Sequence, residues 1–249
     1  MSDSTVILNA RLPQRAGLYQ IAIQAGKITR LERSDQHFVP PSVEENAQLL
    51  DVEGDWITLG ALDLQIIGAL GLAFPDLRLD NLEQLQKICE LLWQQGVSAF
   101  CPTLVTTSIE NFQGSLRAIQ AFQQSQSGLG TAQVVGVHLE GPFLNKAKRG
   151  AHPAEYLQPL NLDTVKAVIG EFTSAIRIMT LAPEEATEEV ISWLTAQGIT
   201  VSLGHSLATA EQATQAFDQG ATMVTHAFNA MPRLHHREPG LLGMALTDS

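Results

Sequence analysis

The sequence predicts an α/β fold in which a small N-terminal β module is followed by an incomplete TIM (β/α) barrel. Three observations support this prediction. A unit of helix, glycine, buried strand and polar strand end recurs from about residue 57 onward, which is typical of a parallel sheet with helical crossovers. Residues capable of chemistry follow several different strands, as they do in a TIM barrel. The phosphate loops G-x-G-x-x-G and G-x-x-x-x-G-K-[ST], which would favour a doubly wound sheet, do not occur.

Residues 1–56 are predicted to form a small, incomplete β-sandwich module. Alternating apolar residues, with turn formers around Gly17 and Gly26, indicate short strands. The expected strands lie at residues 6–8, 19–23, 27–31 and 48–52. A polar segment at 34–46 precedes the last of them, and the pattern changes near Gly54. We therefore place the domain boundary there.

Residues 57–249 are predicted to form the barrel, with about six β/α units. A helix is expected at 81–95, because Asp80 can act as its N-cap, Glu83 completes a capping box and Gly96 ends it. Buried strands are expected at residues 57–59, 97–101, 133–139, 176–181, 199–203 and 221–225. A closed barrel needs eight strands, so the chain is expected to be C-terminally truncated.

Composition excludes several classes of function. The formal net charge of -11 and the pI near 5.0 argue against a nucleic-acid surface or an anionic membrane. Cys89 and Cys101 are the only cysteines, too few for a disulfide framework, which favours the cytoplasm. No apolar stretch approaches the roughly 18 residues of a membrane span, and no signal peptide is recognised. We therefore expect a cytoplasmic protein with neither nucleic acid nor membrane as partner.

Glu140, His205 and His226 each lie at the carboxyl end of a predicted strand. One carboxylate and two imidazoles suit a divalent ion such as zinc, and three protein ligands leave a position for water, as in catalytic zinc sites. Taken singly, Glu140 could cap a loop, and a lone histidine on an apolar strand is more often a core residue. Three strand ends together favour a catalytic metal site. His138 shares a strand face with Glu140 and is interpreted as supporting the site without binding the ion.

Five segments of the chain carry the sequence patterns of a known family. They lie at residues 137–143, 148–152, 180–184, 204–206 and 225–231. Together they resemble the N-acetylglucosamine-6-phosphate deacetylases of the amidohydrolase superfamily, over essentially the whole chain. The resemblance implies a barrel of the metallo-dependent hydrolase type. It also implies deacetylation of N-acetyl-D-glucosamine 6-phosphate to D-glucosamine 6-phosphate and acetate, in amino-sugar catabolism, and a homodimer for the intact enzyme.

The resemblance implies a mononuclear metal centre. Glu140, His205 and His226 match the metal ligands of the family. Gln65 and Ile67 stand where many amidohydrolases have the two histidines of an H-x-H motif, and neither can build a second metal site. One divalent ion per chain is expected, with zinc as the first choice and iron, cobalt or manganese as alternatives.

The resemblance also implies substrate contacts. Ala151 and His152 match the segment next to the scissile amide, where His152 would polarise the acetyl carbonyl. Asn229 and Ala230 match the loop that meets the sugar phosphate. Arg237 matches a cation that reaches across the dimer to the neighbouring subunit's phosphate, and a guanidinium suits a phosphate dianion.

Members of this family also carry a general-base aspartate at the tip of the last barrel strand, for which the chain shows no counterpart. Asp248 follows the sixth predicted strand too closely to belong to the eighth. The chain as given is therefore expected to be nearly inert alone. Two alternatives stay open. One is another amidohydrolase reaction, dihydroorotase-like or a deamination, which would favour paired histidines at positions 65 and 67. The other is a non-catalytic, truncated metal-binding fragment.

Overall fold

The computed structural model describes residues 4–34, 47–126, 130–187 and 189–247. Residues 35–46 of the predicted polar segment, and Asp248, lie outside the described residues. Contacts divide the chain into two compact units, Met1–Gly60 and Ala61–Ser249. Within the described ranges, no helix combines the length and the apolar character that crossing a bilayer requires.

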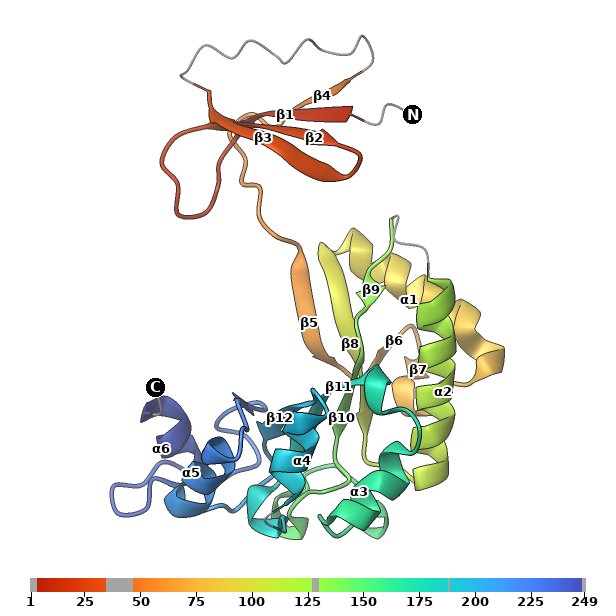
Figure 1. The fold of residues 1–249 in the computed structure, drawn as a ribbon, viewed down its shortest axis with the longest axis vertical. Coiled ribbons are helices and arrows are strands. Elements are labelled where there is room, and N and C mark those ends of the chain that lie inside the picture. Colours follow the sequence, from red (N-terminus) through yellow and green to blue (C-terminus); the bar gives the residue numbers. More distant parts are fainter. Residues whose placement is uncertain (1–3, 35–46, 127–129, 188, 248–249) are drawn as a thin grey trace. The chain divides into compact units, whose positions relative to one another are not determined.

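The smaller unit contains a four-stranded sheet (Figure 1). Its strands are β1 (Ser4–Ala10), β2 (Tyr19–Gln24), β3 (Lys27–Arg33) and β4 (Gln48–Asp51), in the order β3-β2-β1-β4. The β1–β2 and β2–β3 pairs are antiparallel, and β4 runs parallel to β1. The four strands predicted from the alternation of apolar residues are thus confirmed, with bounds that differ by a few residues. Among the described residues of this unit, the buried apolar side chains are those of Val6, Ala10, Ile21 and Ala22.

A curled parallel sheet forms the centre of the larger unit (Figure 1). Its strands are β5 (Ala61–Ile66), β8 (Val97–Val105), β10 (Val137–Glu140), β11 (Ile176–Leu181), β12 (Thr200–Leu203) and β13 (Met223–Val224), in the order β13-β12-β11-β10-β8-β5. β9 (Gln133–Val134) also pairs with β8, and β6 (Gly68–Ala69) forms a separate pair with β7 (Leu72–Ala73). This arrangement confirms the predicted incomplete TIM barrel with an N-terminal β module.

Helices follow the strands of this sheet and cover it. They are α1 (Leu82–Gln94), α2 (Ile109–Ser125), α3 (Leu162–Ile169), α4 (Val190–Ala196), α5 (Ala210–Asp218) and α6 (Gly240–Thr247). Short 3-10 turns lie at Phe74–Asp76, Leu79–Asn81, Lys146–Lys148, Ala154–Tyr156, Thr173–Ala175 and Pro183–Glu185.

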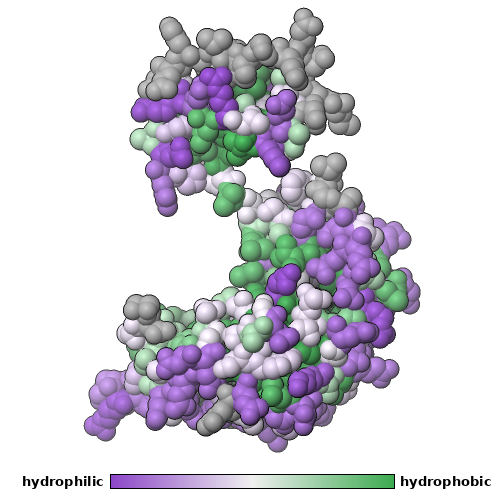
Figure 2. All heavy atoms as spheres, viewed as in Figure 1, coloured by the Kyte–Doolittle hydropathy of each residue, from purple (hydrophilic) through white to green (hydrophobic). Residues whose placement is uncertain are grey.

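The core of the larger unit lies between the sheet and the helices. Leu85 and Ile88 of α1, Phe112 and Leu116 of α2, and Phe100 of β8 have no exposed surface. Figure 2 shows hydrophilic residues over the outward side of the helices. The central strands are largely buried, and they combine apolar residues with buried polar ones such as His138, Thr180 and Ser202.

Two local predictions need correction. Asp80 is not the N-cap of α1, because it lies inside the 3-10 turn that precedes the helix, and Asn81 takes the cap position. The predicted strand at 57–59 is also wrong. The first parallel strand begins at Ala61, where pairing with Val97 of β8 begins, and Leu59 is 95% exposed.

Candidate metal centre

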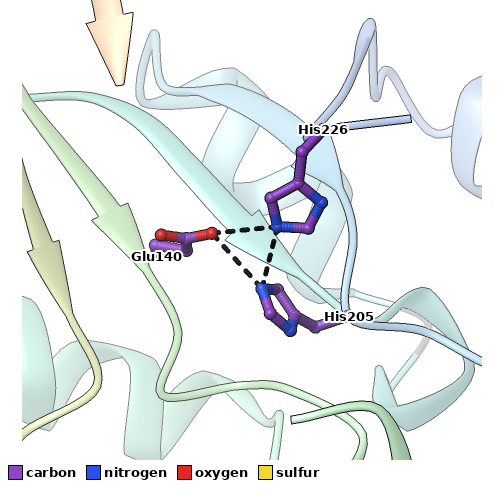
Figure 3. Close-up of side chains that lie close together, drawn as sticks. All are labelled: Glu140, His205 and His226. Carbon is purple, nitrogen blue, oxygen red and sulfur yellow. Dashed lines mark hydrogen bonds and ion pairs between the residues drawn. The ribbon is translucent and has the colours of Figure 1, made fainter. Parts of the chain in front are cut away.

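The three residues predicted to bind metal lie at the carboxyl end of the parallel sheet. Glu140 is the last residue of β10. His205 lies two residues after the end of β12, and His226 lies two residues after the end of β13. Both histidines have a left-handed backbone, with φ of 49° and 32°. Such conformations cost energy outside glycine and are frequent at functional sites. The turns aim both imidazoles at the Glu140 carboxylate (Figure 3).

The donor atoms of the three side chains converge. Oε1 of Glu140 lies 3.3 Å from Nε2 of His205 and 3.2 Å from Nε2 of His226, and the two nitrogens are 3.0 Å apart. Glu140 and His205 are buried, and His226 is partly buried. Ligand atoms at these separations can all contact one ion at bond lengths of about 2 Å. The centre is therefore a candidate site for a divalent metal ion.

Hydrogen bonds select the nitrogen that each histidine can offer. Nδ1 of His205 lies 2.8 Å from the Lys148 carbonyl oxygen, which can only accept, so Nδ1 carries the proton. In the neutral ring, Nε2 then presents its lone pair to the centre, which is the usual arrangement of a metal-binding histidine. Nδ1 of His226 is buried without a hydrogen-bond partner among the described residues, which leaves Nε2 as the nitrogen engaged at the centre.

The electrostatics of the centre favour a positive charge. Burial by itself raises the pKa of Glu140, but the two imidazoles beside its Oε1 outweigh burial and hold the pKa below its ordinary value. The contact with Glu140 raises the pKa of His226 in turn. A carboxylate and two nitrogen lone pairs this close repel one another unless a proton or a metal cation lies among them. The donor set therefore fits a divalent cation.

Gln65, which the sequence left without a role, contacts the same carboxylate. Its Nε2 donates a hydrogen bond of 2.9 Å to Oε1 of Glu140. The Gln65 backbone N–H donates to Asp63 in the same strand, at 3.0 Å. The side chain of Ile67 offers no donor atom and is 48% exposed. Gln65 thus connects the edge strand β5 with the centre, and its match to the first histidine position of the H-x-H motif was the available signal.

His152 is held next to the centre as a neutral ring. Its ring packs edge-on against that of His205, with centroids 4.6 Å apart. Burial and the neighbouring His205 lower the pKa of His152 to about 4. The backbone N–H of Thr106 donates to Nδ1 at 3.3 Å, and the Thr106 hydroxyl lies 2.7 Å from the same nitrogen. Since Nδ1 accepts, the proton of the neutral ring is on Nε2, which makes His152 a hydrogen-bond donor.

The remaining residues predicted to contact substrate differ in position. Asn229 and Ala230 belong to the loop that begins at His226, and the Asn229 N–H donates to the His226 carbonyl at 2.9 Å. Ala151 is exposed next to His152. Arg237 is also exposed, further along the loop that leads to α6. The structure therefore brings Asn229 and Ala230 close to His226 through the backbone, while Arg237 faces solvent.

Two partners in the centre were missed from the sequence. The Lys148 carbonyl is a backbone group, which every residue possesses, so no sequence signal exists for it. Thr106 lies just after β8 and contacts His152 across 46 positions of sequence. The contact forms only because the loop after β10 folds back onto the end of β8.

Comparisons with known proteins agree with this architecture. No family model matches the chain. The N-acetylglucosamine-6-phosphate deacetylase of Bos taurus is 41% identical over 201 residues, which are 80% of this chain and 48% of the relative. The N-acetylgalactosamine-6-phosphate deacetylase of Escherichia coli O157:H7 is 34% identical over 231 residues, covering 92% of this chain and 57% of the relative. The crystal structure of an N-acetylglucosamine-6-phosphate deacetylase from Pasteurella multocida matches with a TM-score of 0.82 at 30% identity, covering 99% of this chain and 62% of that one.

The chain spans about half the length of the curated relatives it matches. Within that half, the structural similarity extends over both the small sheet and the barrel strands that carry Glu140, His205 and His226. Over most of its length, this chain is therefore similar to N-acetylglucosamine-6-phosphate deacetylases that are about twice as long.

Proposed function

We propose that this chain provides the metal-binding half of an enzyme that removes acetate from N-acetyl-D-glucosamine 6-phosphate. The products are D-glucosamine 6-phosphate and acetate. The observation that carries the proposal is the convergence of Glu140, His205 and His226 on one point at the carboxyl end of the sheet. Active sites of TIM barrels are built at this end.

Glu140, His205 and His226 would hold one divalent ion, and zinc is the metal we propose. The set of one carboxylate and two imidazoles, with three protein ligands, suits catalytic zinc. When bound, such an ion supplies Lewis acidity toward the amide carbonyl and toward water. Gln65 would orient the Glu140 carboxylate, since it donates to the oxygen that faces both imidazoles.

His152 would act on the acetyl group as a hydrogen-bond donor. Its Nδ1 is anchored by Thr106, and its Nε2–H has no hydrogen-bond partner among the residues that the structure describes. Because the pKa of His152 is lowered to about 4, the ring is neutral at physiological pH and donates without introducing a charge. Removing a donor of this kind from a developing oxyanion typically costs about 100-fold or more in rate.

Ala151, Asn229 and Ala230 would contact the amino sugar phosphate, and Arg237 would reach the phosphate bound by a second subunit. The exposure of Arg237 supports this role, because a side chain in solvent is able to extend to a partner. A homodimer is thus part of the proposal. We assign no residue of this chain to proton transfer between water and the leaving amine, so slow or no turnover is expected from these 249 residues alone.

A binding experiment tests the proposed metal site. Zinc is titrated into metal-free chain, and the bound ion is measured by competition with a chromophoric chelator. One ion per chain is expected, with binding lost in His205→Ala. The matched control is His236→Ala, which removes an exposed loop histidine outside the centre and should leave the affinity unchanged. Equal affinity in both variants would contradict the site, and two bound ions would contradict a mononuclear centre.

A ligand experiment tests the substrate. Binding of N-acetylglucosamine 6-phosphate to zinc-loaded chain is measured by calorimetry, beside N-acetylgalactosamine 6-phosphate, the substrate named for the relative from Escherichia coli. Tighter binding of the glucosamine compound is expected. Tighter binding of the galactosamine compound would transfer the proposal to that substrate. Zinc binding without affinity for either compound would favour a non-catalytic metal-binding chain.

A further inference from the structure

A continuous line of buried side-chain hydrogen bonds crosses the sheet beneath the metal centre. Nδ1 of His138 lies 3.1 Å from the Leu64 carbonyl oxygen, and its Nε2 lies 2.7 Å from the Thr180 hydroxyl. The Thr180 hydroxyl lies 2.6 Å from that of Thr225, which lies 2.7 Å from that of Ser202. His138, Thr180, Thr225 and Ser202 are all buried. The line therefore joins β5, β10, β11, β12 and the end of β13.

The direction of every hydrogen bond in this line follows from its first member. The Leu64 carbonyl can only accept, so Nδ1 of His138 carries a proton. Both ring nitrogens face neutral partners, and the neutral ring accepts at Nε2, so Thr180 donates to it. Each hydroxyl has a single proton. Thr225 must therefore donate to Thr180, and Ser202 to Thr225.

The line ends at a place where the backbone pairing of β5 is irregular. The register of β5 with β8 shifts between Asp63 and Ile66, and Ile66 lies opposite Pro102, which has no N–H to donate. The Leu64 carbonyl lies inside this irregular stretch and receives its hydrogen bond from the His138 side chain. The next residue, Gln65, donates to Glu140.

Four of the five members of the line, all except Thr180, stand close in sequence to a residue of the centre. Leu64 precedes Gln65, His138 shares β10 with Glu140, Thr225 precedes His226, and Ser202 lies shortly before His205. A displacement along the line would thus shift the donor atoms of the centre. Positions of metal ligands are commonly set by such supporting hydrogen bonds.

We propose that His138 is a positioning residue. Through the line of hydrogen bonds from Ser202 to the Leu64 carbonyl, it fixes the ends of β5, β10, β12 and β13 relative to one another, and these ends carry the residues of the metal centre. The proposal rests on the proposed metal site. His138 acts by holding Gln65 on the irregular part of β5 against the Glu140 carboxylate. The alternative is that the line only satisfies buried polar groups, in which case its loss would lower stability without changing the centre.

The two nitrogens of His138 can be tested separately. Asparagine places its amide near the position of Nδ1 and glutamine near that of Nε2, so His138→Asn retains the link to Leu64 and His138→Gln retains the link to Thr180. The dissociation constant of zinc is expected to rise by about 10–100-fold in His138→Gln and in Thr180→Val. His138→Asn keeps the link to Leu64 but loses the link to Thr180, so its zinc affinity should fall as in Thr180→Val while amide exchange at residues 61–66 stays unchanged. Amide exchange at residues 61–66 of metal-free chain should be faster in His138→Gln.

Ser115→Ala is the matched control. Ser115 is fully buried and its hydroxyl donates to the Pro75 carbonyl at 2.9 Å, away from the centre. This variant should lower the melting temperature as Thr180→Val does, while zinc affinity and exchange in β5 stay unchanged. A zinc affinity in His138→Gln and Thr180→Val within about twofold of that in Ser115→Ala would overturn the proposal.

A measurement without metal separates this proposal from the proposed function. In metal-free chain, ¹⁵N NMR of His138 should show the tautomer with the proton on Nδ1. A proton on Nε2 would reverse the line and sink the positioning role, whatever the zinc result. Absence of zinc binding by the unmodified chain would instead refute the metal site. Amide hydrogen exchange at residues 61–66 in His138→Gln would then test the positioning role of His138 without the metal.

Discussion

β10 and β5 are both neighbours of β8, and each contributes a side chain to the centre, but they are held in different ways. All four residues of β10 are buried, including Glu140. β5 is at the end of the strand order, and its Leu62 is 54% exposed. Packing on both faces therefore sets the position of Glu140. Hydrogen bonds at Leu64 and Gln65 instead set the position of the edge strand β5. The Glu140 carboxylate is thus carried by the fully buried strand β10 and receives a hydrogen bond from Gln65 on the less buried edge strand β5.

The largest expected effect compares two leucines on these strands. Leu139 on β10 has no exposed surface, and Leu139→Ala should lower the free energy of unfolding by about 2–5 kcal/mol through lost burial and a cavity. Leu62→Ala should change it by about 0.5 kcal/mol or less, since Leu62 is half exposed. Urea unfolding is followed by the fluorescence of Trp93 and Trp193, in a background where Trp56 is replaced by Phe. Similar losses in the two variants would remove the distinction between the strands.

A second comparison uses thiol reactivity on neighbouring strands. Burial raises the pKa of Cys101, on β8, to about 11, so at pH 8 its thiolate fraction is about 100-fold below that of an ordinary thiol. Leu62→Cys places a new thiol on β5 at a half-exposed position. At pH 8 a disulfide reagent should modify the new thiol quickly and leave Cys101 unmodified, with the Cys101 rate rising as the pH approaches 11. Fast modification of Cys101 at pH 8 in folded chain would show that β8 is not closed to solvent.

The smallest expected effect concerns the turn after Glu140. Gly141 has a φ of 84°, and a Cβ there would overlap the Thr106 hydroxyl that holds His152. Gly96, before β8, has a φ of 81°, and a Cβ at that position would meet nothing within 4 Å. Alanine at either position should lower the free energy of unfolding by about 1 kcal/mol, because its backbone is strained in the left-handed region. The overlap with Thr106 should lower the stability of Gly141→Ala by about another 1 kcal/mol. Denaturant midpoints measure the difference, and equal midpoints would mean that Thr106 moves freely.

Sequence reasoning succeeded where the signal is local or periodic. Alternation identified the strands of the small sheet, and the repeated strand ends identified Glu140, His205 and His226 as candidates. It failed where a neighbour decides the structure. The segment at 57–59 is apolar enough for a strand, but β8 offers a partner only from Val97, so β5 begins at Ala61. Asp80 has the right chemistry for a cap, but the 3-10 turn moves the start of α1 past it.

The sequence by itself determined the order of strands and helices, the end of the sheet that carries the chemistry, and the residue types available there. These properties follow from the period of apolar residues and from the turn formers, which act over a few positions of chain. Only the tertiary structure decided that one oxygen of Glu140 faces two imidazoles and Gln65, that Thr106 sets the tautomer of His152, and that His138 joins the edge strand to the centre. These contacts join residues far apart in the chain, and their geometry depends on strand register and packing, which no local pattern encodes.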